Sequence, residues 1–478
     1  MRNRIEATNG EQRRCAAVFV ARRLRAVLAC VLLAGGAFAA GTTYYVSDAT
    51  GNDASNGLAW ATAKKTIQPA INLCSAGDTV LVSNGVFILN ASLTVPSRVR
   101  LTSLAGPAVT IINGNNPVVT NRCVYVPNSS MGALIEGFTF TNGSTANESG
   151  GGVFLAGAAL VSNCVIRGNS AVNGAGIACQ ATGVIMHCSV TGNRASNNGG
   201  GIYVYRAGTV RNCLIAGNSG YEGAVFCENG GYVRDCVISN NSSSAGYAGV
   251  RMRYTGGAIE ACTIVSNTAA GSGGGLGIDA GSTALCCVVT LNTAAAPNAD
   301  FGGVYCDGLI RSSLITRNRA VDMAGGLFVG ANGVAENCTI CSNSAGGSYG
   351  GVRYDGILRN SIVYGNSAPV TTNAAPNGSN AFCQYTCTLP LQAGDGNITS
   401  DPDFVNRALG DYHLNPTSPC LNAGTNLDWM ATASDLDGNP RSIGLRADMG
   451  CYEALPEPAG AAVALLFLAC LRRALPRA

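Results

Sequence analysis

Short stretches in which apolar and polar residues alternate recur at a nearly constant interval between residues 150 and 366. Each unit contains a glycine-led stretch, such as Gly303-Val304-Tyr305-Cys306, and later a phrase such as Cys338-Thr339-Ile340 that leads to an asparagine. Alternation with a period of two residues is typical of β-strands, in which every second side chain faces the interior. The closing asparagines are spaced by 23 to 26 residues and are Asn169, Asn193, Asn218, Asn241, Asn267, Asn292, Asn318, Asn343 and Asn366.

This repeat predicts an all-β fold, a parallel β-helix in which each unit makes one turn. No unit offers ten residues with helical periodicity, and each unit is too short for a four-stranded propeller blade. Short strands separated by Gly, Asn and Ser turns fit a stacked coil instead. Equivalent residues of successive coils then lie about 4.8 Å apart. We expect about nine regular coils after irregular ones, with the asparagines stacked at a corner where Asn tolerates left-handed backbone.

Cysteines mark a second column, which comprises Cys164, Cys188, Cys213, Cys236, Cys262, Cys287 and Cys338, with Ser313 and Ser361 in two of the steps. Such a column could serve redox chemistry or metal binding, but a stack of small buried apolar residues is the simpler interpretation. Stacked neighbours point in parallel directions, which is a poor geometry for disulfides. We therefore expect most of the 21 cysteines to be free thiols.

Composition removes several function classes. Only 12% of the 478 residues are charged and the formal net charge is +3, which is too small and too scattered for a nucleic-acid-binding surface. His187 and His413 are the only histidines, so a histidine-based catalytic triad or metal site has little support. We expect no metal ion or other cofactor, and we expect a monomer.

The two ends carry features of an exported protein. Residues 1–40 place arginines before an apolar run and a small-residue cleavage site, which predicts a signal peptide. Residues 455–478 contain Pro456-Glu457-Pro458, an apolar run too short for an ordinary membrane span, and an arginine pair. This segment resembles a PEP-type C-terminal sorting tail. The resemblance implies transient membrane contact and a location at the cell surface, at the outer membrane or outside the cell.

The residues before the regular array resemble the start of bacterial pectate-lyase-like β-helix proteins. They contain paired tyrosines, a short amphipathic helix expected over 67–74 and an apolar strand that ends at Val82. The resemblance implies that residues 41–100 form the cap and first coils of a right-handed parallel β-helix. Such a cap covers an open sheet end and prevents edge-to-edge association. The main β-helix is expected over 101–368.

After an irregular linker or coil expected over 369–400, residues 401–454 form a further module. Its motifs include Asp401-Pro402-Asp403 and Asp448-Met449-Gly450. Their order resembles the choice-of-anchor Q module of exported bacterial β-helix proteins. Small residues that are usual near both ends of that module appear here as Cys420 and Cys451, for which we expect a disulfide. The repeats themselves are also similar to those of polymorphic outer-membrane proteins.

Candidate binding residues gather on one strand face of the repeat. If the residue after the paired glycines points inward, the third does too, and the second and fourth point outward. The outward aromatic and charged residues include Tyr203, Tyr205, Phe226, Arg251, Tyr305, Arg353 and Asp355. Aromatic rings stack on sugar faces, and charged groups bind hydroxyls or uronates. The face therefore predicts carbohydrate binding, and we expect no other strand face to be so decorated.

The fourth-position column also offers catalytic candidates. Asp279 and Asp307 are one coil apart, about 5 Å, which is the carboxylate separation of a retaining glycosidase. Glu228 and Asp279 are two coils apart, about 9–10 Å, near the inverting range. A pectate-lyase-like reaction would need carboxylates that hold Ca²⁺ and an arginine base, and Arg253 lies between Glu228 and Asp279. For any single residue, a charge that keeps an outward face soluble is the simpler interpretation.

Two function classes remain open. The first is a non-catalytic exported β-helix protein that acts in adhesion or binds a polysaccharide or cell-surface matrix. The second is a polysaccharide lyase or glycoside hydrolase that acts on an acidic polysaccharide at the aromatic and charged face. Fold alone cannot decide between them. The array has tight turns and almost no insertions that would wall a groove, which favours the non-catalytic class.

Overall fold

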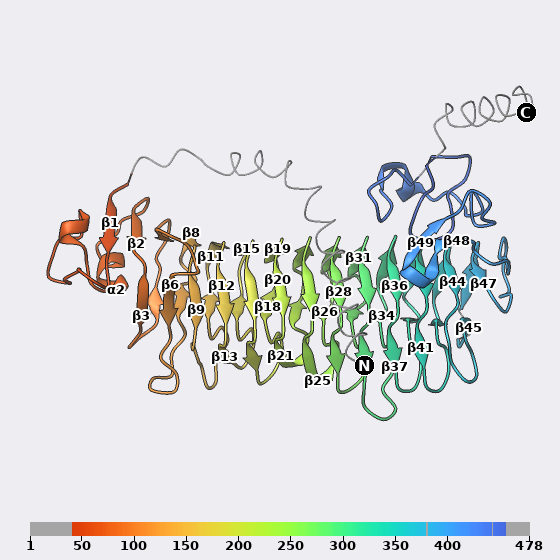
Figure 1. The fold of residues 1–478 in the computed structure, drawn as a ribbon, viewed down its shortest axis with the longest axis horizontal. Helices are drawn as coiled ribbons and strands as arrows, with labels where there is room; N and C mark the ends of the chain where they lie inside the picture. Colours follow the sequence, from red (N-terminus) through yellow and green to blue (C-terminus); the bar gives the residue numbers. More distant parts are fainter. Residues whose placement is uncertain (1–40, 379–380, 442, 456–478) are drawn as a thin grey trace, which may run out of the picture.

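The computed structural model describes residues 41–378, 381–441 and 443–455. Their regular structure consists almost entirely of short parallel strands, which stack into an elongated coil (Figure 1). Three long sheets run along this coil: sheet A with 14 strands, sheet B with 13 and sheet C with 12, and the shorter sheet D adds eight. The predicted signal peptide lies outside the described residues, as does all but the first residue of the predicted sorting tail.

One turn of the coil visits the four sheets in a fixed order. The chain passes from β10 (Val153–Leu155) in sheet C to β11 (Ala158–Ser162) in sheet A, β12 (Val165–Arg167) in sheet B and β13 (Ser170–Ala171) in sheet D. It then re-enters sheet C at β14 (Ile177–Cys179), which pairs in parallel with β10. The predicted parallel β-helix is confirmed, with about twelve turns once the irregular first coils are included.

Sheet C carries the candidate residues and grows by one strand per turn. Its strands in order are β4 (Leu93–Thr94), β7 (Val124–Val126), β10, β14, β18 (Ile202–Tyr205), β22 (Val225–Glu228), β26 (Val250–Arg253), β30 (Leu276–Ile278), β34 (Val304–Cys306), β38 (Leu327–Val329), β42 (Val352–Tyr354) and β45 (Ala374–Pro376). The last strand shows that residues after 368 complete a further turn, together with β46 (Phe382–Gln384) and β47 (Cys387–Thr388). The linker expected over 369–400 is therefore partly built into the solenoid.

The asparagine column is confirmed as a buried ladder. The side-chain amide of Asn218 donates to Asn241 Oδ1 at 3.1 Å and to the Val190 carbonyl at 2.9 Å, and its backbone N–H also donates to Asn241 Oδ1. The same pattern repeats along the column and ends on Asn373. The reason given for it needs correction, because the residue before each asparagine adopts the left-handed conformation, as Gly217 does with φ 64°. The asparagines serve as buried connectors between coils.

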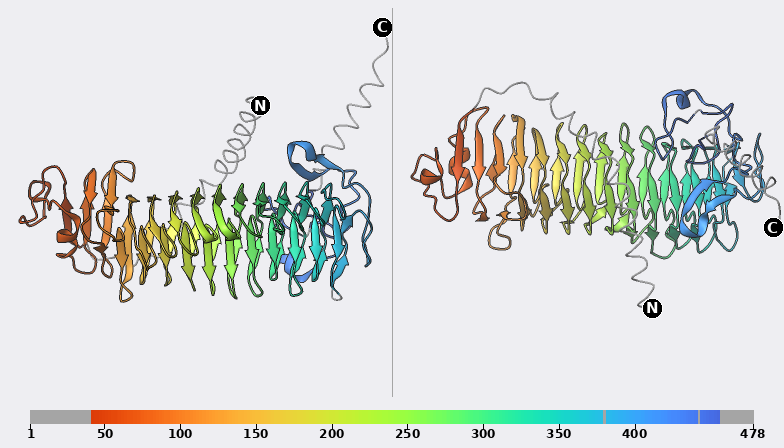
Figure 2. Two further views of the ribbon diagram at one scale, coloured as in Figure 1. Left: turned by 90° about the horizontal axis from the view of Figure 1, so that it is seen from below. Right: turned by 45° about the horizontal axis from the view of Figure 1, so that its top comes forward.

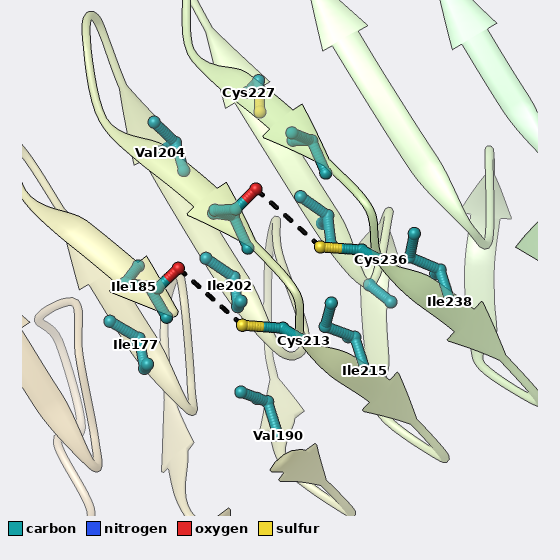
Figure 3. Close-up of a cluster of buried hydrophobic side chains, with 14 of the residues drawn as sticks. Ile177, Ile185, Val190, Ile202, Val204, Cys213, Ile215, Cys227, Cys236 and Ile238 are labelled. Carbon is teal, nitrogen blue, oxygen red and sulfur yellow. Dashed lines mark hydrogen bonds between the residues drawn. The ribbon is translucent and has the colours of Figure 1, made fainter. Parts of the chain in front are cut away.

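The cysteine column is also confirmed as a buried stack of free thiols (Figure 3). Cys213 and Cys236 point into the core beside apolar residues such as Ile215, and their thiols face backbone carbonyls of the preceding turn at 3.7 and 3.8 Å. Burial contributes to raising the pKa of Cys236 well above its ordinary value. The residue before each of these cysteines is left-handed, as Asp235 is with φ 52°, which turns the chain from sheet A into sheet B.

The N-terminal end of the coil is closed by its own first residues. Strand β1 (Thr43–Val46) begins sheet A and pairs with β2 (Thr79–Val82). The expected helix is shorter than 67–74, since α2 spans Ile67–Ile71, and it buries Ile67, Ala70 and Ile71 against the first strands. A 3₁₀ turn, η2 (Trp60–Thr62), precedes it. Apolar burial on one helical face explains why so short a helix persists.

The C-terminal module is a separate body that packs against the side of the last turns (Figure 2). It contains an antiparallel pair, β48 (Phe404–Asn406) and β49 (Asp411–Leu414), and two 3₁₀ turns, η3 (Arg407–Leu409) and η4 (Asp428–Thr432). Its buried Tyr412 hydroxyl shares a hydrogen bond of 2.7 Å with Thr316 of sheet B. The module thus covers part of two sheets near the C-terminal end of the coil.

Candidate functional site

The outward columns of sheet C follow the alternation that the sequence predicts. Inward positions such as Val225 and Cys227 lie in the main core, whereas Glu228 points away from it. The ladder register aligns the second positions from Tyr203 through Phe226, Arg251, Gly277, Tyr305 and Phe328 to Arg353. The candidate residues therefore do form vertical columns on one face.

The aromatic rings of the second-position column pack on one another. Tyr203 stacks on Phe226 with ring centroids 5.8 Å apart, and Tyr305 stacks on Phe328 at 5.5 Å. Phe226 is fully buried, so the proposed contact between this ring and a sugar is wrong. Tyr203 and Tyr305 remain partly exposed. Stacking between coils leaves only part of each ring free for a ligand.

Arg251 lies at the centre of the most elaborate cluster on this face. Its Nη2 is 2.6 Å from Asp279 Oδ1, and its guanidinium lies 4.0 Å from the Tyr247 ring centre and 5.8 Å from that of Tyr305. Gly277 makes this arrangement possible, because a Cβ at that position would lie 2.5 Å from the Tyr247 ring and 2.7 Å from Arg251 Nη1. Only 12% of the Arg251 side chain is exposed, and its Nε and Nη1 are buried without a hydrogen-bond partner within the described residues.

Two members of this surface were missed by sequence reasoning. Tyr247 has a left-handed backbone, with φ 51°, at a position where most coils have glycine. A tyrosine in place of the usual glycine is the sequence signal that could have identified it. Glu222 belongs to β21 (Ser219–Glu222) of sheet D, outside the columns that were considered. Burial raises the pKa of the Glu222 carboxyl, with Arg251 opposing the shift and Asp279 adding to it. Glu222 therefore lies within electrostatic range of the Arg251 cluster.

The four catalytic candidates do not converge on a common point. Asp279 accepts a hydrogen bond from the Tyr254 backbone N–H at 3.0 Å, toward the preceding coil. Asp307 turns toward the following coil, where it accepts bonds from the backbone and side chain of Asn332, each at 3.1 Å. The two carboxylates are on adjacent coils, as predicted, but each is held by a partner on the side away from the other.

Glu228 and Arg253 also have partners within the fold. The Glu228 carboxylate accepts a hydrogen bond from the Tyr203 hydroxyl, and burial together with this carboxylate raises the pKa of Tyr203. The Arg253 guanidinium lies 5.0 Å from the centre of the Tyr254 ring. No ion pair joins Arg253 to Glu228 or Asp279 among the interactions of the described residues. Three of the four candidates are thus held by hydrogen bonds and the fourth by a ring.

Two further binding candidates, Arg353 and Asp355, lie near the C-terminal end of the face. The Arg353 guanidinium lies 5.1 Å from the Phe328 ring centre and 5.9 Å from that of Tyr349. Its Nε and one carboxylate oxygen of Asp355 are buried without a hydrogen-bond partner within the described residues. These two side chains therefore retain unused hydrogen-bonding capacity.

An open depression lies at the other end of the fourth-position column. It has a volume of about 320 Å³ and is lined by Asn128, Ala156, Gln180, Tyr205 and Arg206. The Arg206 guanidinium lies 5.0 Å from the Tyr205 ring centre. Gln180 and Arg206 are exposed, and the Tyr205 ring is partly so. This is the place on sheet C where a ring, an amide and a cation border free space together.

Sheet A contradicts the expectation that no other strand face is so decorated. Glu336 in β39 (Val334–Glu336) is fully buried between Arg311 and Arg359, whose Nε atoms each lie 2.6 Å from a carboxylate oxygen. Trp429 of the C-terminal module lies over Arg311, with 4.4 Å between the guanidinium and the ring centre. The C-terminal module therefore lies over one end of this outward cluster, at Arg311.

The disulfide predicted between Cys420 and Cys451 is not formed, since both are buried free thiols. Cys451 is held by sheet B, because its backbone N–H donates to Thr339 Oγ1 at 3.0 Å. The Cys420 backbone N–H donates to Ser418 Oγ at 3.1 Å, and the proximity of Cys387 together with burial raises the pKa of the Cys420 thiol. The two cysteines belong to the same apolar cluster but have different hydrogen-bond partners.

No group of three or more His, Cys, Asp or Glu side chains in the described part of the chain is arranged to hold a metal ion. Across the same residues, no helix has the length and apolar character required to cross a bilayer.

Comparisons with known proteins agree with this architecture. Residues 84–234, about a third of the chain, match the family model described as "Right handed beta helix region". No protein with a curated description matches the chain in sequence.

Several solved structures are similar in fold. They include pectate lyase Pel9A (14% identity, 88% of this chain and 98% of that chain, TM-score 0.41) and XylC in complex with xylose (9%, 76% and 87%, 0.45). A third is the A-module of the Azotobacter vinelandii mannuronan C-5 epimerase AlgE6 (15%, 68% and 95%, 0.38). At these identities the likeness concerns the fold alone. In fold, this chain is a right-handed parallel β-helix, the architecture that the matched family model describes.

Proposed function

We propose that this chain is a non-catalytic, exported β-helix protein that binds polysaccharide on the outward face of sheet C, at the cell surface or in the surrounding matrix. The observation that supports binding most strongly is the depression beside Tyr205, where an aromatic ring, the Gln180 amide and the Arg206 cation border open space. A pyranose ring can stack on the tyrosine while its hydroxyls take hydrogen bonds from the amide and the guanidinium.

The arrangement of the carboxylates supports a non-catalytic role. A glycosidase pair must face one bond from two sides, whereas Asp279 and Asp307 turn toward opposite coils. Glu228 is engaged by the Tyr203 hydroxyl. The same face is rigid, because every strand of sheet C between β4 and β45 is paired on both sides and rings stack between coils. A rigid, pre-formed surface loses little entropy when an extended polymer lies along it.

Export and surface attachment belong to the same proposal. They rest on the sequence of residues 1–40 and 455–478 and on the likeness of residues 401–454 to an anchor module. Polysaccharide or matrix is the proposed partner, the protein is proposed to act as a monomer, and no cofactor is required for binding.

The alternative is a polysaccharide lyase or hydrolase at the Arg251 cluster. The observation that favours it is Glu222, a half-buried acid with a raised pKa near Asp279. A general acid with a raised pKa beside an ionised carboxylate is the usual pairing in glycoside hydrolysis. A lyase would in addition use a calcium ion.

Both possibilities are tested on one panel of plant and algal polysaccharides, with polygalacturonate and alginate as acidic polymers and xylan and a β-glucan as neutral ones. Affinity electrophoresis measures binding, while absorbance at 235 nm and reducing ends report cleavage. We expect binding without turnover, weakened about tenfold by Tyr205→Ala and unchanged by Tyr221→Ala, an exposed tyrosine on sheet D. No binding to any polymer would refute the proposal. Turnover that is abolished by Asp279→Asn or Glu222→Gln would show that the chain is a polysaccharide lyase or hydrolase and would refute the non-catalytic proposal.

A further inference from the structure

The first and last strands of the three long sheets lie at the two ends of the coil, where each has a strand neighbour on one side only. At the C-terminal end, residues that follow the last turn cover all three edges. The Gln392 side chain donates to a carbonyl of β45 at 3.1 Å, the Asn397 side chain donates to a carbonyl of β46 at 3.0 Å, and Ile398 pairs with β47. Covering an edge protects it from pairing with another chain.

At the N-terminal end the cap covers two edges and leaves the third. The Gly57 carbonyl accepts from the Tyr45 N–H of β1 in sheet A at 2.7 Å, and the Gln68 side chain accepts from the Thr94 N–H of β4 in sheet C at 2.8 Å. Strand β3 (Gly85–Ile88) begins sheet B, and within the described ranges no strand pairs with its outer side. The N-terminal closure of the coil is therefore incomplete at sheet B.

The backbone groups on the open side of β3 belong to Val86 and Ile88. Alternate residues of a strand turn their N–H and C=O groups to opposite neighbours. The N–H groups of Gly85 and Leu89 donate at 3.0 and 2.9 Å to carbonyls at or beside the ends of β6 (Thr110–Asn113), which uses the side that faces this strand. The groups between them therefore face the open side. The side chains of Val86 and Ile88 are also exposed, by 48% and 61%.

The surroundings of this edge are apolar and uncharged. Leu104 and Val109, in the segment that leads to β6, are 57% and 44% exposed. Residues 79–97 and 101–121 contain no Asp, Glu, Lys or Arg. Edge strands are commonly protected by charged side chains or a proline, and the sequence of β3 has neither. The surface therefore favours an uncharged partner over a charged one.

The shape of this end shows which occupant fits. After β1 the chain passes the start of β3 at Asp48 and turns back into the cap instead of adding a strand there. The cap, with α2 and η2, extends beyond β3 along the coil axis (Figure 1, Figure 2). A second whole coil placed against β3 would meet this cap, whereas a single extended segment needs only the strand edge. A strand contributed by another protein therefore fits this edge better than a second copy of the coil.

We propose that the outer edge of β3 binds an extended, uncharged segment of another protein, which adds a strand to sheet B. Main-chain hydrogen bonds to Val86 and Ile88 hold the segment, and apolar residues at its alternate positions pack beside these two side chains. The pairing is non-covalent and leaves the coil monomeric. The edge belongs to sheet B, so the inference is independent of polysaccharide binding by sheet C.

The test uses the full chain and a fluorescently labelled synthetic peptide with the sequence of residues 84–90, which is uncharged and has the alternation of β3 itself. Fluorescence anisotropy measures binding of the peptide. We expect Ile88→Lys to weaken binding at least about tenfold, because a charged residue on an edge opposes strand addition. The matched control is Val237→Lys, on β24 (Val237–Ser239) inside the same sheet, where the side chain is 41% exposed and binding should be unchanged.

A second peptide separates strand addition from apolar adhesion. It has the same side chains but is methylated on every amide nitrogen, so it cannot donate main-chain hydrogen bonds and should not bind. Hydrogen exchange at single residues should be fast for the Val86 and Ile88 amides in the free protein and slower with the first peptide. Failure of the first peptide to bind, equal binding of the second, or slow exchange of these amides in the free protein would overturn the proposal. Exchange that slows as the protein concentration rises would also overturn it, because the edge would then belong to a contact with a second copy.

Discussion

Sheets A and C carry the same kinds of outward residue, but the fold uses them differently. On sheet A, Arg311 and Arg359 pair with the buried Glu336, and Trp429 of the C-terminal module lies over Arg311. On sheet C, Tyr205 and Arg206 border open space. Residue type alone therefore does not mark a binding surface. What matters is whether another part of the chain covers it.

The contrast is also visible within sheet C itself. Phe226 is as buried as a core residue, although it occupies an outward column, because the stacked Tyr203 ring and the adjoining turns surround it. Tyr205 lies two residues after Tyr203 in the same strand, β18, and its side chain is partly exposed.

The largest effect is expected from Phe226→Ala. Removal of a fully buried ring leaves a cavity, which lowers the free energy of unfolding by about 3–5 kcal/mol in urea denaturation. Phe226→Leu should cost less than about 1.5 kcal/mol, since most of the volume is kept. Neither change should alter the affinity of the folded fraction for polysaccharide. Weaker polysaccharide binding by a fully folded Phe226 variant would show that this ring takes part in binding.

The next largest effect is expected from Glu336→Gln, which should lower the free energy of unfolding by about 3 kcal/mol. The change leaves the Arg311 and Arg359 guanidinium groups facing a neutral amide in a buried site. The matched control is Glu260→Gln on the same sheet, where the carboxylate lies 3.7 Å from Arg234 and is partly exposed, and where we expect at most about 1 kcal/mol. Equal losses at the two positions would show that the module does not bury the cluster.

The module should become less stable as pH rises. His413 lies between Asp411 and Asp437, and hydrogen bonds to these carboxylates raise its pKa to about 9 from 6.5. Burial and Asp448 raise the pKa of Glu453 to about 7 from 4.5. Both groups bind protons more tightly in the folded state, so each stabilises the fold at low pH. The contribution of Glu453 to the free energy of unfolding is lost between pH 4.5 and 7, and that of His413 between pH 6.5 and 9.

Unfolding curves at pH 6 and pH 9.5 measure this effect. Since His413 is nearly half exposed, we expect its share to be on the order of 1 kcal/mol after solvent screening. His413→Gln should flatten the dependence between pH 6.5 and 9 and leave the part below pH 6.5 unchanged. A wild-type module that gains stability over this range would contradict the assignment.

The smallest effect is expected from Tyr232→Phe, which removes only a hydroxyl on the part of sheet A that the module does not reach. Its hydroxyl bonds to Glu260, and a single partly exposed hydrogen bond contributes about 0.5–1 kcal/mol. Thermal unfolding measures the stability change, and affinity electrophoresis should show unaltered polysaccharide binding. Loss of binding in this variant would move the binding surface from sheet C to sheet A.

The sequence predicts the features that repeat and misses those that depend on contacts between distant residues. The alternation in a stretch such as Gly303-Val304-Tyr305-Cys306 and the asparagine spacing are local, so the coil and its inward and outward columns could be predicted. Strands of sheet A such as β19 (Thr209–Arg211) have three residues and no flanking glycine pair, and that sheet was overlooked. On that sheet Arg311 is covered by Trp429, which is more than 100 residues away along the chain.

The candidate site shows the same limit. Tyr205, Glu228 and Asp279 could be placed on one face from their positions in the repeat. Their partners could not be predicted, because Glu222 comes from sheet D and the direction of each carboxylate depends on which neighbouring coil offers an N–H. The expected disulfide between Cys420 and Cys451 is not formed, because the positions of these two thiols depend on how the module packs against sheet B.

The most direct measurement is hydroxyl-radical footprinting of the full chain with and without a saturating oligosaccharide of the polymer that binds best. If the depression beside Tyr205 on sheet C is the binding surface, oxidation of Tyr205 falls on binding. Tyr221 on sheet D and Tyr232 on sheet A are then oxidised to the same extent with and without the ligand. Protection of Tyr232 or Tyr221 with Tyr205 unchanged would contradict the account.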